Sequence, residues 1–446
     1  MELIGAHPGR KVIIYFAAAI IVGTVLLYLP VSSAGDPISF LDAVFTSTSA
    51  VCVTGLVVLD TGSDFSMFGQ IVILCLIQLG GLGIMTFATS LLMMMGGRVS
   101  FFDRLGINQN FGGGFSAGSL LMAVLVTTIA FEGFGAIALF LEFQADYPTG
   151  EAIYHAVFHS ISAFCNAGFS TFPNGLEGYR DSSSAIAIFS VLIIFGGLGF
   201  IVIRELLQRI VNKKLKLSLH TKLCLSVTAI LLVIGTAAFF IFEQDNVLKD
   251  SGGVYSLGNA FFQSVTCRTA GFNMIPQVHF TEVSLLIMFI LMFIGACPGS
   301  TGGGIKTTTT AVILLLVYNR YRGKSSVSAF RRSIDNDSVR RAVTLILLAS
   351  LAIVALFALL MFAGEKPLPH ELSHGWFVDN LFEIVSAFGT VGLSLGITSQ
   401  VTGLGKIVLI LAMFIGRVGL LTLAFGLARM PRKGEIVYAD ESVMVG

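Results

Sequence analysis

The chain has 446 residues, of which 55% are hydrophobic and 12% are charged. An average soluble protein carries about 25% charged residues, so this chain has too few charges to cover a surface that faces water. The composition excludes a soluble enzyme, a nucleic-acid-binding module and a secreted disulfide scaffold. The net charge of +1 also argues against binding to nucleic acid. We therefore predict an all-α polytopic membrane protein in the lipid bilayer of the cell membrane.

Apolar stretches of about 20 residues, long enough to cross a bilayer, recur along the chain. They lie near 12–30, 69–95, 119–141, 185–208, 219–242, 282–297, 307–319, 342–363 and 405–428. The short stretches at 282–297 and 307–319 flank the sequence CPGSTGGGIKT, so we interpret them as one broken helix and expect eight transmembrane helices. The first stretch has flanks like those of a signal peptide. Its apolar run exceeds the about 7–15 residues of such signals, so we expect it to be retained.

The charges in the loops predict the orientation of these helices. Lys and Arg gather before the first stretch, after the second, after the fourth, around 320–341 and after 428, whereas the alternate loops carry mainly Asp and Glu. Basic loops stay in the cytoplasm under the positive-inside rule. We therefore expect both termini to be cytoplasmic.

Each predicted outer loop contains a short apolar segment that ends in a glycine. The segments read AVFTSTSAVCVTGL (43–56), AVFHSISAFCNAGFS (156–170), NAFFQSVTCRTAGFN (259–273) and NLFEIVSAFGTVGLS (380–394). In each, a Phe precedes the glycine by ten residues; three carry Ser six residues before it, and the third has Val265 there. Such a repeat decides the architecture: span, re-entrant pore helix, loop and span, four times in the same orientation. The repeats cover 12–96, 119–210, 219–320 and 338–430, and 431–446 form a cytoplasmic tail.

Four such loops can converge on a pseudo-fourfold pore, because irregular backbone at membrane depth survives only inside protein or against water. Carbonyls turned to the axis would replace the hydration shell of a monovalent cation. We predict that K⁺ binds the backbone carbonyls of Val53, Thr54, Asn166, Ala167, Thr269, Ala270, Thr390 and Val391. This selectivity filter is completed by Gly55, Gly168, Gly271 and Gly392. One loop glycine usually marks only a turn, but four at one offset favour the pore.

The break in the sixth span predicts a gate inside the membrane. Proline cannot continue a helix, and glycines leave the backbone free to move. The break at 297–306 contains Pro298, Gly299, Ser300, Thr301, Gly302, Gly303, Gly304 and Lys306. The alternative interpretation is a fixed kink.

Arg417 is expected to form a barrier in the pore. It lies roughly 18 Å along a helix that starts near Gly405, at about 1.5 Å per residue, which places it in mid-bilayer. A charge there costs at least about 2.5–3.5 kcal/mol, so it should face a protein or water cavity, where it would repel cations. The alternative is a structural tie from Arg417 to carbonyls of the gate loop.

Other polar residues in apolar surroundings receive no role. Glu151, His155 and His159 share one helix face, as metal ligands can. We interpret them as a helix-start carboxylate and two partly buried histidines, because the other repeats lack them. Glu132 lies midway along a span, where a functional role and a packed, hydrogen-bonded carboxyl both stay open. The six cysteines form no CxxC pair, and we expect them to be reduced packing residues.

The four loops, PGSTGGGIKT at 298–307 and IGRVGLLTL at 415–423 resemble the Trk/Ktr/HKT superfamily of potassium transporters. The first repeat begins almost at the N-terminus, which is more similar to KtrB than to TrkH. The resemblance implies a K⁺-translocating subunit, often Na⁺-dependent, that works as a homodimer with a cytoplasmic ring of nucleotide-binding KtrA/TrkA-type subunits. It also implies an intramembrane loop and an arginine below the filter. This chain has no GxxxxGK[ST] or Rossmann motif, so we expect it to bind no nucleotide itself.

Alternative functions remain open. A solute symporter of another fold would hold its substrate at broken helices in mid-membrane, but repeats in one orientation, each with a re-entrant loop, favour a pore on their axis. A membrane-embedded enzyme would need an acid–base or metal cluster, for which only Glu151, His155 and His159 are candidates, so we expect no enzyme. Within the superfamily, the alternative is a cation symporter or a Na⁺-permeable member.

Overall fold

The computed structural model describes residues 8–94, 117–249, 252–364, 375–420 and 422–423. This part of the chain is predominantly helical, which confirms the predicted class. Its α-helices are α1 (Pro8–Tyr28), α2 (Phe40–Val51), α3 (Met67–Met94), α5 (Ala117–Phe143), α6 (Thr149–Phe164), α7 (Ser183–Leu198), α8 (Phe200–Val211), α9 (Leu219–Glu243), α10 (Gly253–Thr266), α11 (Glu282–Phe293), α12 (Thr307–Tyr321), α13 (Asn336–Ala363), α14 (Trp376–Gly389) and α15 (Gly403–Val418). The predicted tail at 431–446 and the ends of the first and fourth predicted repeats lie outside the described residues.

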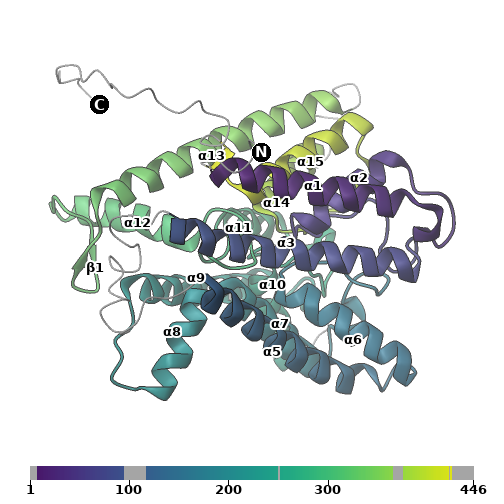
Figure 1. The fold of residues 1–446 in the computed structure, drawn as a ribbon, viewed down its shortest axis with the longest axis horizontal. Coiled ribbons are helices and arrows are strands. Elements are labelled where there is room, and N and C mark those ends of the chain that lie inside the picture. Colours follow the sequence, from purple (N-terminus) through teal and green to yellow (C-terminus); the bar gives the residue numbers. More distant parts are fainter. Residues whose placement is uncertain (1–7, 95–116, 250–251, 365–374, 421, 424–446) are drawn as a thin grey trace.

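Shorter elements join these helices. Single 3₁₀ turns are η2 (Pro30–Ser32), η4 (Glu177–Tyr179), η5 (Gln277–His279) and η7 (Thr398–Gln400). In the described residues the only sheet is a hairpin of β1 (Ser328–Ala329) and β2 (Arg332–Ser333), which are antiparallel. The hairpin connects α12 to α13 (Figure 1).

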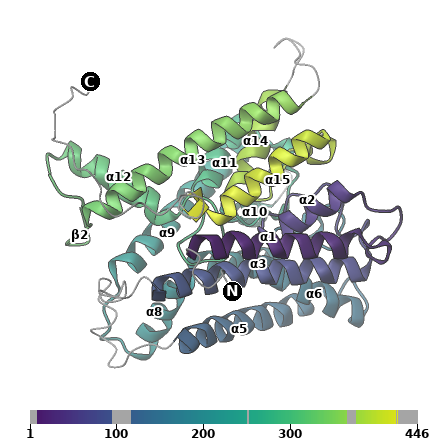
Figure 2. The ribbon, with the colours of Figure 1, turned by 45° about the horizontal axis from the view of Figure 1, so that its top comes forward.

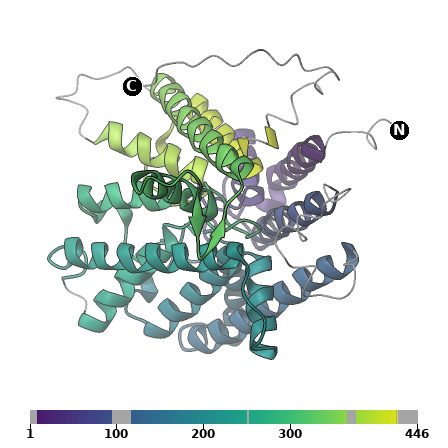
Figure 3. The same ribbon diagram turned by 90° about the vertical axis from the view of Figure 1, so that its left-hand side faces the viewer.

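The helices follow one another around a common centre in chain order. Figure 3 shows the colours passing round the molecule from purple through blue, teal and green to yellow. Figure 2 shows α1, α3 and α5 side by side, with α13 and α15 inclined to them. The circle closes where α15 packs against α2. There Lys406 Nζ lies 2.6 Å from Asp42 Oδ1, in a partly buried salt bridge that joins the two ends of the fold.

Side-chain caps in the sequence fix where several helices begin. A capping Ser, Thr or Asp accepts a hydrogen bond from the backbone N–H three residues on, and so satisfies one of the free donors at a helix start. The caps are Ser39, Ser182, Ser218, Thr281, Asp335 and Thr402. Helix starts are therefore set locally, by residues that can be read from the sequence.

Four described helices are long and apolar enough to cross a membrane. They are Gly9–Tyr28, Val124–Phe143, Leu219–Glu243 and Asn336–Ala363, which belong to α1, α5, α9 and α13. A fifth candidate is the pair α7 and α8, if the two helices form one span. The segment Met67–Gly83 of α3 and the helix α11 are apolar but shorter. Eight spans therefore stay a prediction.

The stretch predicted as one span at 185–208 forms two helices. α7 and α8 meet at a bend of 104°. Gly199 makes the corner with φ +85°, a conformation that favours glycine. A Cβ at Gly199 would lie 2.6 Å from the carbonyl oxygen of Pro298, so the corner also packs closely against the loop after α11. This contact with a distant segment explains why the apolar pattern alone did not predict the bend.

Two other predicted stretches end earlier than expected. α11 ends at Phe293, before the predicted end at 297, and the next backbone N–H groups bond across the loop: Gly295 N–H donates to Ile305 O over 2.9 Å. α15 ends at Val418, and Gly419 follows with φ +84°. The stretch 405–428 is therefore not one continuous helix.

Glycines let three helices contact the ends of the short helices beside them. A Cβ at Gly80, Gly196 or Gly416 would collide with a carbonyl oxygen at the end of α2, α6 or α14. The three oxygens belong to Val51, Phe164 and Phe388. The sequence marks the positions with GGLG at 80–83, GGLG at 196–199 and GRVG at 416–419, a repeat that we missed.

We expect Gly196→Ala to destabilise the protein by about 1–3 kcal/mol, because the added methyl overpacks against a backbone carbonyl that cannot move away. Gly133→Ala is the matched control: Gly133 lies in α5 with nothing within 4 Å of its Cβ position, so this change should be neutral or slightly stabilising. Thermal unfolding of the purified variants in detergent measures both. Equal melting temperatures for the two variants would contradict the close packing.

Candidate functional site

The four short helices α2, α6, α10 and α14 end in backbone with positive φ. Two residues before each glycine, a non-glycine residue is left-handed: Val53 (+54°), Asn166 (+58°), Thr269 (+69°) and Thr390 (+49°). The glycines also have positive φ: Gly55 (+92°), Gly168 (+71°), Gly271 (+77°) and Gly392 (+94°). Such conformations cost non-glycine residues of order 1–3 kcal/mol each and cluster at functional sites. Their recurrence at four matching positions marks these loops as the candidate site.

The four glycines form a closed ring. Each faces the carbonyl oxygen that precedes the next glycine. The pairs are Gly55 with Ala167 O, Gly168 with Ala270 O, Gly271 with Val391 O and Gly392 with Thr54 O. A Cβ at Gly55 would lie 2.5 Å from its oxygen, and one at Gly168 would lie 3.0 Å from its oxygen. The residues predicted as a filter are therefore together, and a side chain at any of these glycines would push into backbone.

Buried hydroxyl groups brace the loops. In three of them the brace is the serine six residues before the glycine. The bonds are Gly55 N–H to Ser49 Oγ (3.1 Å), Gly392 N–H to Ser386 Oγ (3.1 Å) and Ser162 Oγ to Phe169 O (2.7 Å). The third loop has Val265 at that position, and the next residue takes over: Thr266 Oγ1 donates to Phe272 O over 2.6 Å. All four loops are thus held by a hydroxyl.

A cavity of about 360 Å³ opens on one side of the ring, and all four glycines line it. Its charged lining residues are Asp60 and Glu177, and its lining contains no Lys or Arg. Asn273 Nδ2 donates to Glu177 Oε1 over 3.0 Å. Burial raises the pKa of Glu177, and the nearby His279 acts in the opposite direction. A cavity lined by one sign of charge concentrates counter-ions, so this mouth favours cations.

The loop 294–306, which contains all the predicted gate residues, lies against the other side of the ring. A Cβ at Gly302 would meet Thr269 Oγ1, and one at Gly303 would meet Thr390 Oγ1. Both hydroxyls are buried and without a hydrogen-bond partner in the described part of the chain. The predicted gate and the predicted filter are therefore in contact.

Backbone groups of α6, α7 and α8 hold this loop. Thr301 N–H donates to Gly196 O over 3.2 Å, and Thr301 Oγ1 donates to Phe164 O over 3.1 Å. At the corner between the helices, Phe200 N–H donates to Gly299 O over 3.1 Å. The loop is irregular, but these bonds pair part of its backbone with protein groups, as irregular backbone at membrane depth requires.

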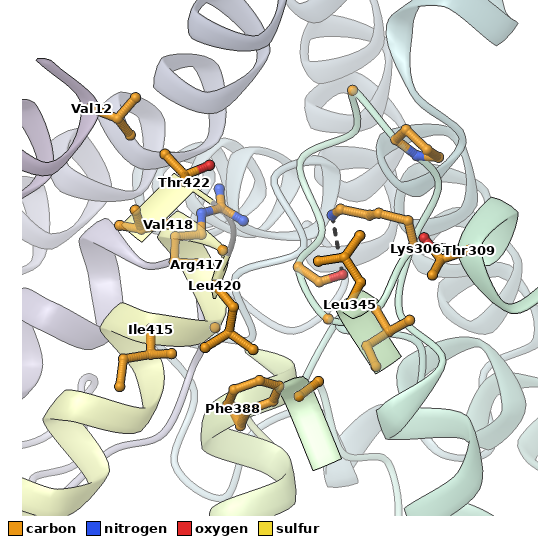
Figure 4. A pocket seen from close by; sticks show the side chains of 18 residues that line it. Val12, Lys306, Thr309, Leu345, Phe388, Ile415, Arg417, Val418, Leu420 and Thr422 are labelled. Atoms are coloured by element: carbon orange, nitrogen blue, oxygen red, sulfur yellow. Dashed lines mark hydrogen bonds between the residues drawn. The ribbon is translucent and has the colours of Figure 1, made fainter. Parts of the chain in front are cut away.

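The side chains of Arg417, from α15, and of Lys306, from the loop itself, lie on opposite sides of a cavity of about 290 Å³ (Figure 4). Arg417, which is 4% exposed, donates from Nη1 to Thr301 O and from Nη2 to Gly80 O over 2.9 Å. Lys306 Nζ donates to Gly302 O over 2.7 Å. The described structure thus contains the tie from Arg417 to the loop, and it also places this charge beside the cavity.

A further buried cation, Arg268, was not predicted. It lies three residues before Gly271 and is 7% exposed. The matching positions in the other loops hold Cys52, Cys165 and Gly389. Its Nη2 donates to Thr228 Oγ1 over 3.3 Å. A cation at this position faces the negative C-terminal end of α10. The sequence does single out Arg268, because it is the only Arg or Lys within the four segments.

Three of the remaining polar candidates, His155, His159 and Glu132, are hydrogen-bonded to neighbouring protein groups. His155 Nδ1 lies 2.7 Å from Thr171 Oγ1, and His159 Nε2 lies 2.9 Å from Ser170 Oγ. Glu151 is in the first turn of α6. Within the described residues no three metal-ligating side chains converge. Gln78 Nε2 donates to Glu132 Oε2 over 3.1 Å, so Glu132 is packed between helices.

The arrangement is suited to moving a cation rather than to covalent chemistry. A carbonyl oxygen lies beside each glycine of the ring, and rings of carbonyls can replace the hydration shell of an ion. An acidic mouth lies on one side, and buried cations with an irregular loop lie on the other. Together with helices of membrane-spanning length, these features define a membrane transport protein.

Comparison with known proteins gives the family. The family model described as TrkH, cation transport protein, matches residues 6–435. The chain therefore belongs to the TrkH family of cation transport proteins, which confirms the resemblance to the Trk/Ktr superfamily. A transport family agrees with the expectation that the chain is not an enzyme.

Relatives match over the full length. The Ktr system potassium uptake protein B of Bacillus subtilis is 39% identical over 98% of this chain and 97% of its own. The potassium/sodium uptake protein NtpJ of Enterococcus hirae is 37% identical over the same shares. The crystal structure of the potassium transporter TrkH from Vibrio parahaemolyticus matches 94% of this chain and 84% of its own, with a TM-score of 0.73 and 19% identity. At that identity the match shows a shared fold.

Proposed function

We propose that this protein takes up K⁺ across the cell membrane through a pore along the axis of the four loops. The closed ring of Gly55, Gly168, Gly271 and Gly392 is the single observation that carries the proposal. Four carbonyl oxygens lie against the glycines of this ring, and such carbonyls can take the place of hydrating water around a monovalent ion. The names of the relatives, which are potassium uptake proteins, support the choice of ion.

The predicted filter carbonyls, including those of Val53, Asn166, Thr269 and Thr390, would hold K⁺ in this pore. The left-handed conformation of these four residues supports the assignment, because such strain persists only where surrounding structure enforces it. The acidic mouth would gather cations before they enter. With one glycine in each loop, the filter offers fewer ordered sites than the TVGYG filter of a potassium channel.

The loop 294–306 would act as the gate. Its contact with Thr269 and Thr390 supports this role, because an ion that leaves the filter on this side meets the loop next. Arg417 would add a fixed positive charge that lowers the resting flux. Its bond to Thr301 O offers a way to draw the guanidinium aside when the loop moves.

The finer architecture and the partners belong to the same proposal. Four repeats in one orientation, eight spans and cytoplasmic termini are supported by the recurring helix–loop geometry and by the basic loops. Na⁺ dependence, a homodimer and a cytoplasmic nucleotide-binding ring of the KtrA/TrkA type follow from the resemblance. The name of the Bacillus relative, which belongs to a Ktr system, supports a multi-component assembly.

A second candidate is a Na⁺-permeable member of the same family. The name of the Enterococcus relative, a potassium/sodium uptake protein, favours it. Both candidates use the same pore, so they differ only in how the carbonyl ring discriminates between the two ions.

Uptake of Rb⁺ into a potassium-uptake-deficient bacterium, with and without Na⁺, tests the function and the filter together. The wild-type chain should restore uptake, and Na⁺ should stimulate it. Gly271→Ser should sharply lower K⁺ affinity or raise Na⁺ permeation, because its Cβ would press on Val391 O and shift a filter carbonyl. Gly178→Ser, at an outer glycine with nothing within 4 Å of its Cβ position, is the control. Unchanged K⁺ and Na⁺ affinities in Ser variants of all four ring glycines would refute the filter.

Deletion of 299–304 should raise K⁺ flux and make it less dependent on the regulatory subunits, because it removes the loop that stands beneath the filter. A milder variant, Thr301→Ala, removes the hydroxyl bonds to Phe164 O and Gly196 O and should act in the same direction. Uptake is normalised to the amount of folded protein in the membrane. Wild-type flux and regulation in both variants would rule out the gate.

Arg417→Ala should raise the maximal K⁺ flux, and Arg417→Lys should keep most of the restraint, because a positive charge near the pore repels the passing ion. The measurement is the initial rate of uptake at saturating K⁺, per folded protein. If Arg417→Ala instead lowers flux in a normally folded and normally abundant protein, the bonds to Thr301 O and Gly80 O are a structural tie and the barrier is wrong.

A further inference from the structure

Helix α8 has an apolar face that the rest of the described chain leaves uncovered. Leu207 is 50% exposed, Ile210 is 72% exposed and Val211 is 89% exposed. Residues three and four positions apart lie on the same side of a helix, so these three form one apolar stripe. Glu205 and Arg209 fall on the opposite side of the helix, and Arg204 and Gln208 flank the stripe. α8 is therefore amphipathic, with its apolar side free at its C-terminal end.

The direction of α8 suits a helix that lies in the membrane surface. α7 is an apolar helix of the bundle, and α8 leaves it at 104°. Figure 1 shows α8 turning away from the direction that α5 and α9 follow. If α7 crosses the bilayer, α8 runs nearly parallel to its plane. Amphipathic helices in this position bury their apolar side at the boundary between headgroups and acyl chains.

The segment after α8 is basic. Lys213, Lys214 and Lys216 are exposed and follow directly on the apolar stripe. The carboxylate of the nearby Glu205 is bonded within the protein: its Oε2 accepts a hydrogen bond from Ser218 N–H over 3.0 Å. A basic segment beside an interfacial apolar stripe complements anionic lipid headgroups, with each basic residue strengthening the association roughly fivefold.

The start of α8 is bonded to the loop 294–306. Phe200 N–H donates to Gly299 O over 3.1 Å. The corner residue Gly199 packs so closely on Pro298 O that a Cβ would lie 2.6 Å from it. Because α8 is a rigid helix, a force on its free end acts directly on this corner. We propose that α8 and the segment 213–216 form a binding site for anionic lipid headgroups, and that its occupancy shifts the loop toward the conducting state. The second half of the proposal rests on the proposed gate.

Tryptophan fluorescence tests the lipid site directly. The chain has a single tryptophan, Trp376, so Trp376→Phe with Ile210→Trp places one probe on the apolar stripe of the full-length protein. In vesicles, brominated phosphatidylglycerol should quench this probe more than brominated phosphatidylcholine at the same mole fraction. A probe at Leu351, which is 67% exposed on α13, should be quenched equally by both. No quenching at position 210 would mean that protein covers the stripe, and equal quenching would mean no headgroup preference; either overturns the site.

The charges are tested with a matched pair of triple variants. Lys213→Gln, Lys214→Gln and Lys216→Gln together should require roughly tenfold or more phosphatidylglycerol for the same quenching. Arg320→Gln, Arg322→Gln and Lys324→Gln remove three exposed basic residues at the C-terminal end of α12 and just after it, and should leave the quenching unchanged. An equal shift in both variants would overturn the assignment to 213–216.

Flux in the same vesicles tests the coupling to the loop. Phosphatidylglycerol should raise Rb⁺ flux severalfold in the wild type and in Phe200→Ala, which keeps the backbone N–H. Phe200→Pro removes that N–H at the first position of a helix, where proline is tolerated, and should lose the response. If the lipid quenches the probe selectively but does not change flux in the wild type, the coupling is overturned while the lipid site stands. If flux responds equally in the Pro and Ala variants, the bond to Gly299 O does not carry the coupling.

Discussion

The backbone at the centre of this protein is buried yet not helical, and the rest of the structure depends on satisfying it. Four short helices end inside the bundle, where an unpaired N–H or C=O costs several kcal/mol. Hydroxyls of Ser49, Ser162, Thr266 and Ser386 bond the loops. Glycines on the neighbouring helices and around the ring bring further backbone into contact. At the ring, the carbonyl oxygens of Thr54, Ala167, Ala270 and Val391 lie against glycines of the neighbouring loops, and we propose that such carbonyls bind the dehydrated cation.

The charged residues on the two sides of the ring have opposite signs. The acids Asp60 and Glu177 line the cavity on one side of the ring. Arg417, which is buried, and Lys306, which is half-buried, lie on the other side, and both donate to carbonyls of the loop 294–306. Ions are therefore attracted at the mouth and meet positive charge after the ring. Because the loop 294–306 is not helical, its carbonyls can exchange hydrogen-bond partners without unfolding a helix. The proposed restraint on flux therefore lies where the backbone can most easily rearrange.

The four segments and the helices beside them are not identical, and the differences lie close to the loop 294–306. Three helices carry G-x-x-G beside the short helices, and in the last of them the second residue is Arg417 where the first two have Gly81 and Gly197. The third segment has Arg268 where the others have Cys or Gly, and the loop 294–306 follows it. The second has the bend at Gly199 that joins α8 to this loop. These exceptions place a positive charge, an irregular loop and the corner to α8 around an otherwise regular ring.

The sequence by itself determined the membrane class, the four segments with their glycines, the intramembrane break and the buried Arg417, because each leaves a local mark in composition, spacing or a residue that cannot lie in lipid. The Ser, Thr and Asp caps of the helices and the basic loops are local marks of the same kind. Only the tertiary structure decided which carbonyl each glycine faces, that Thr266 replaces the missing serine, and that 185–208 bends by 104° at Gly199. It also brought Asp60 and Glu177 into one mouth. Most of these features arise from contacts between segments about one hundred to more than three hundred residues apart, and the brace by Thr266 depends on how its loop packs. No periodicity along the chain encodes them.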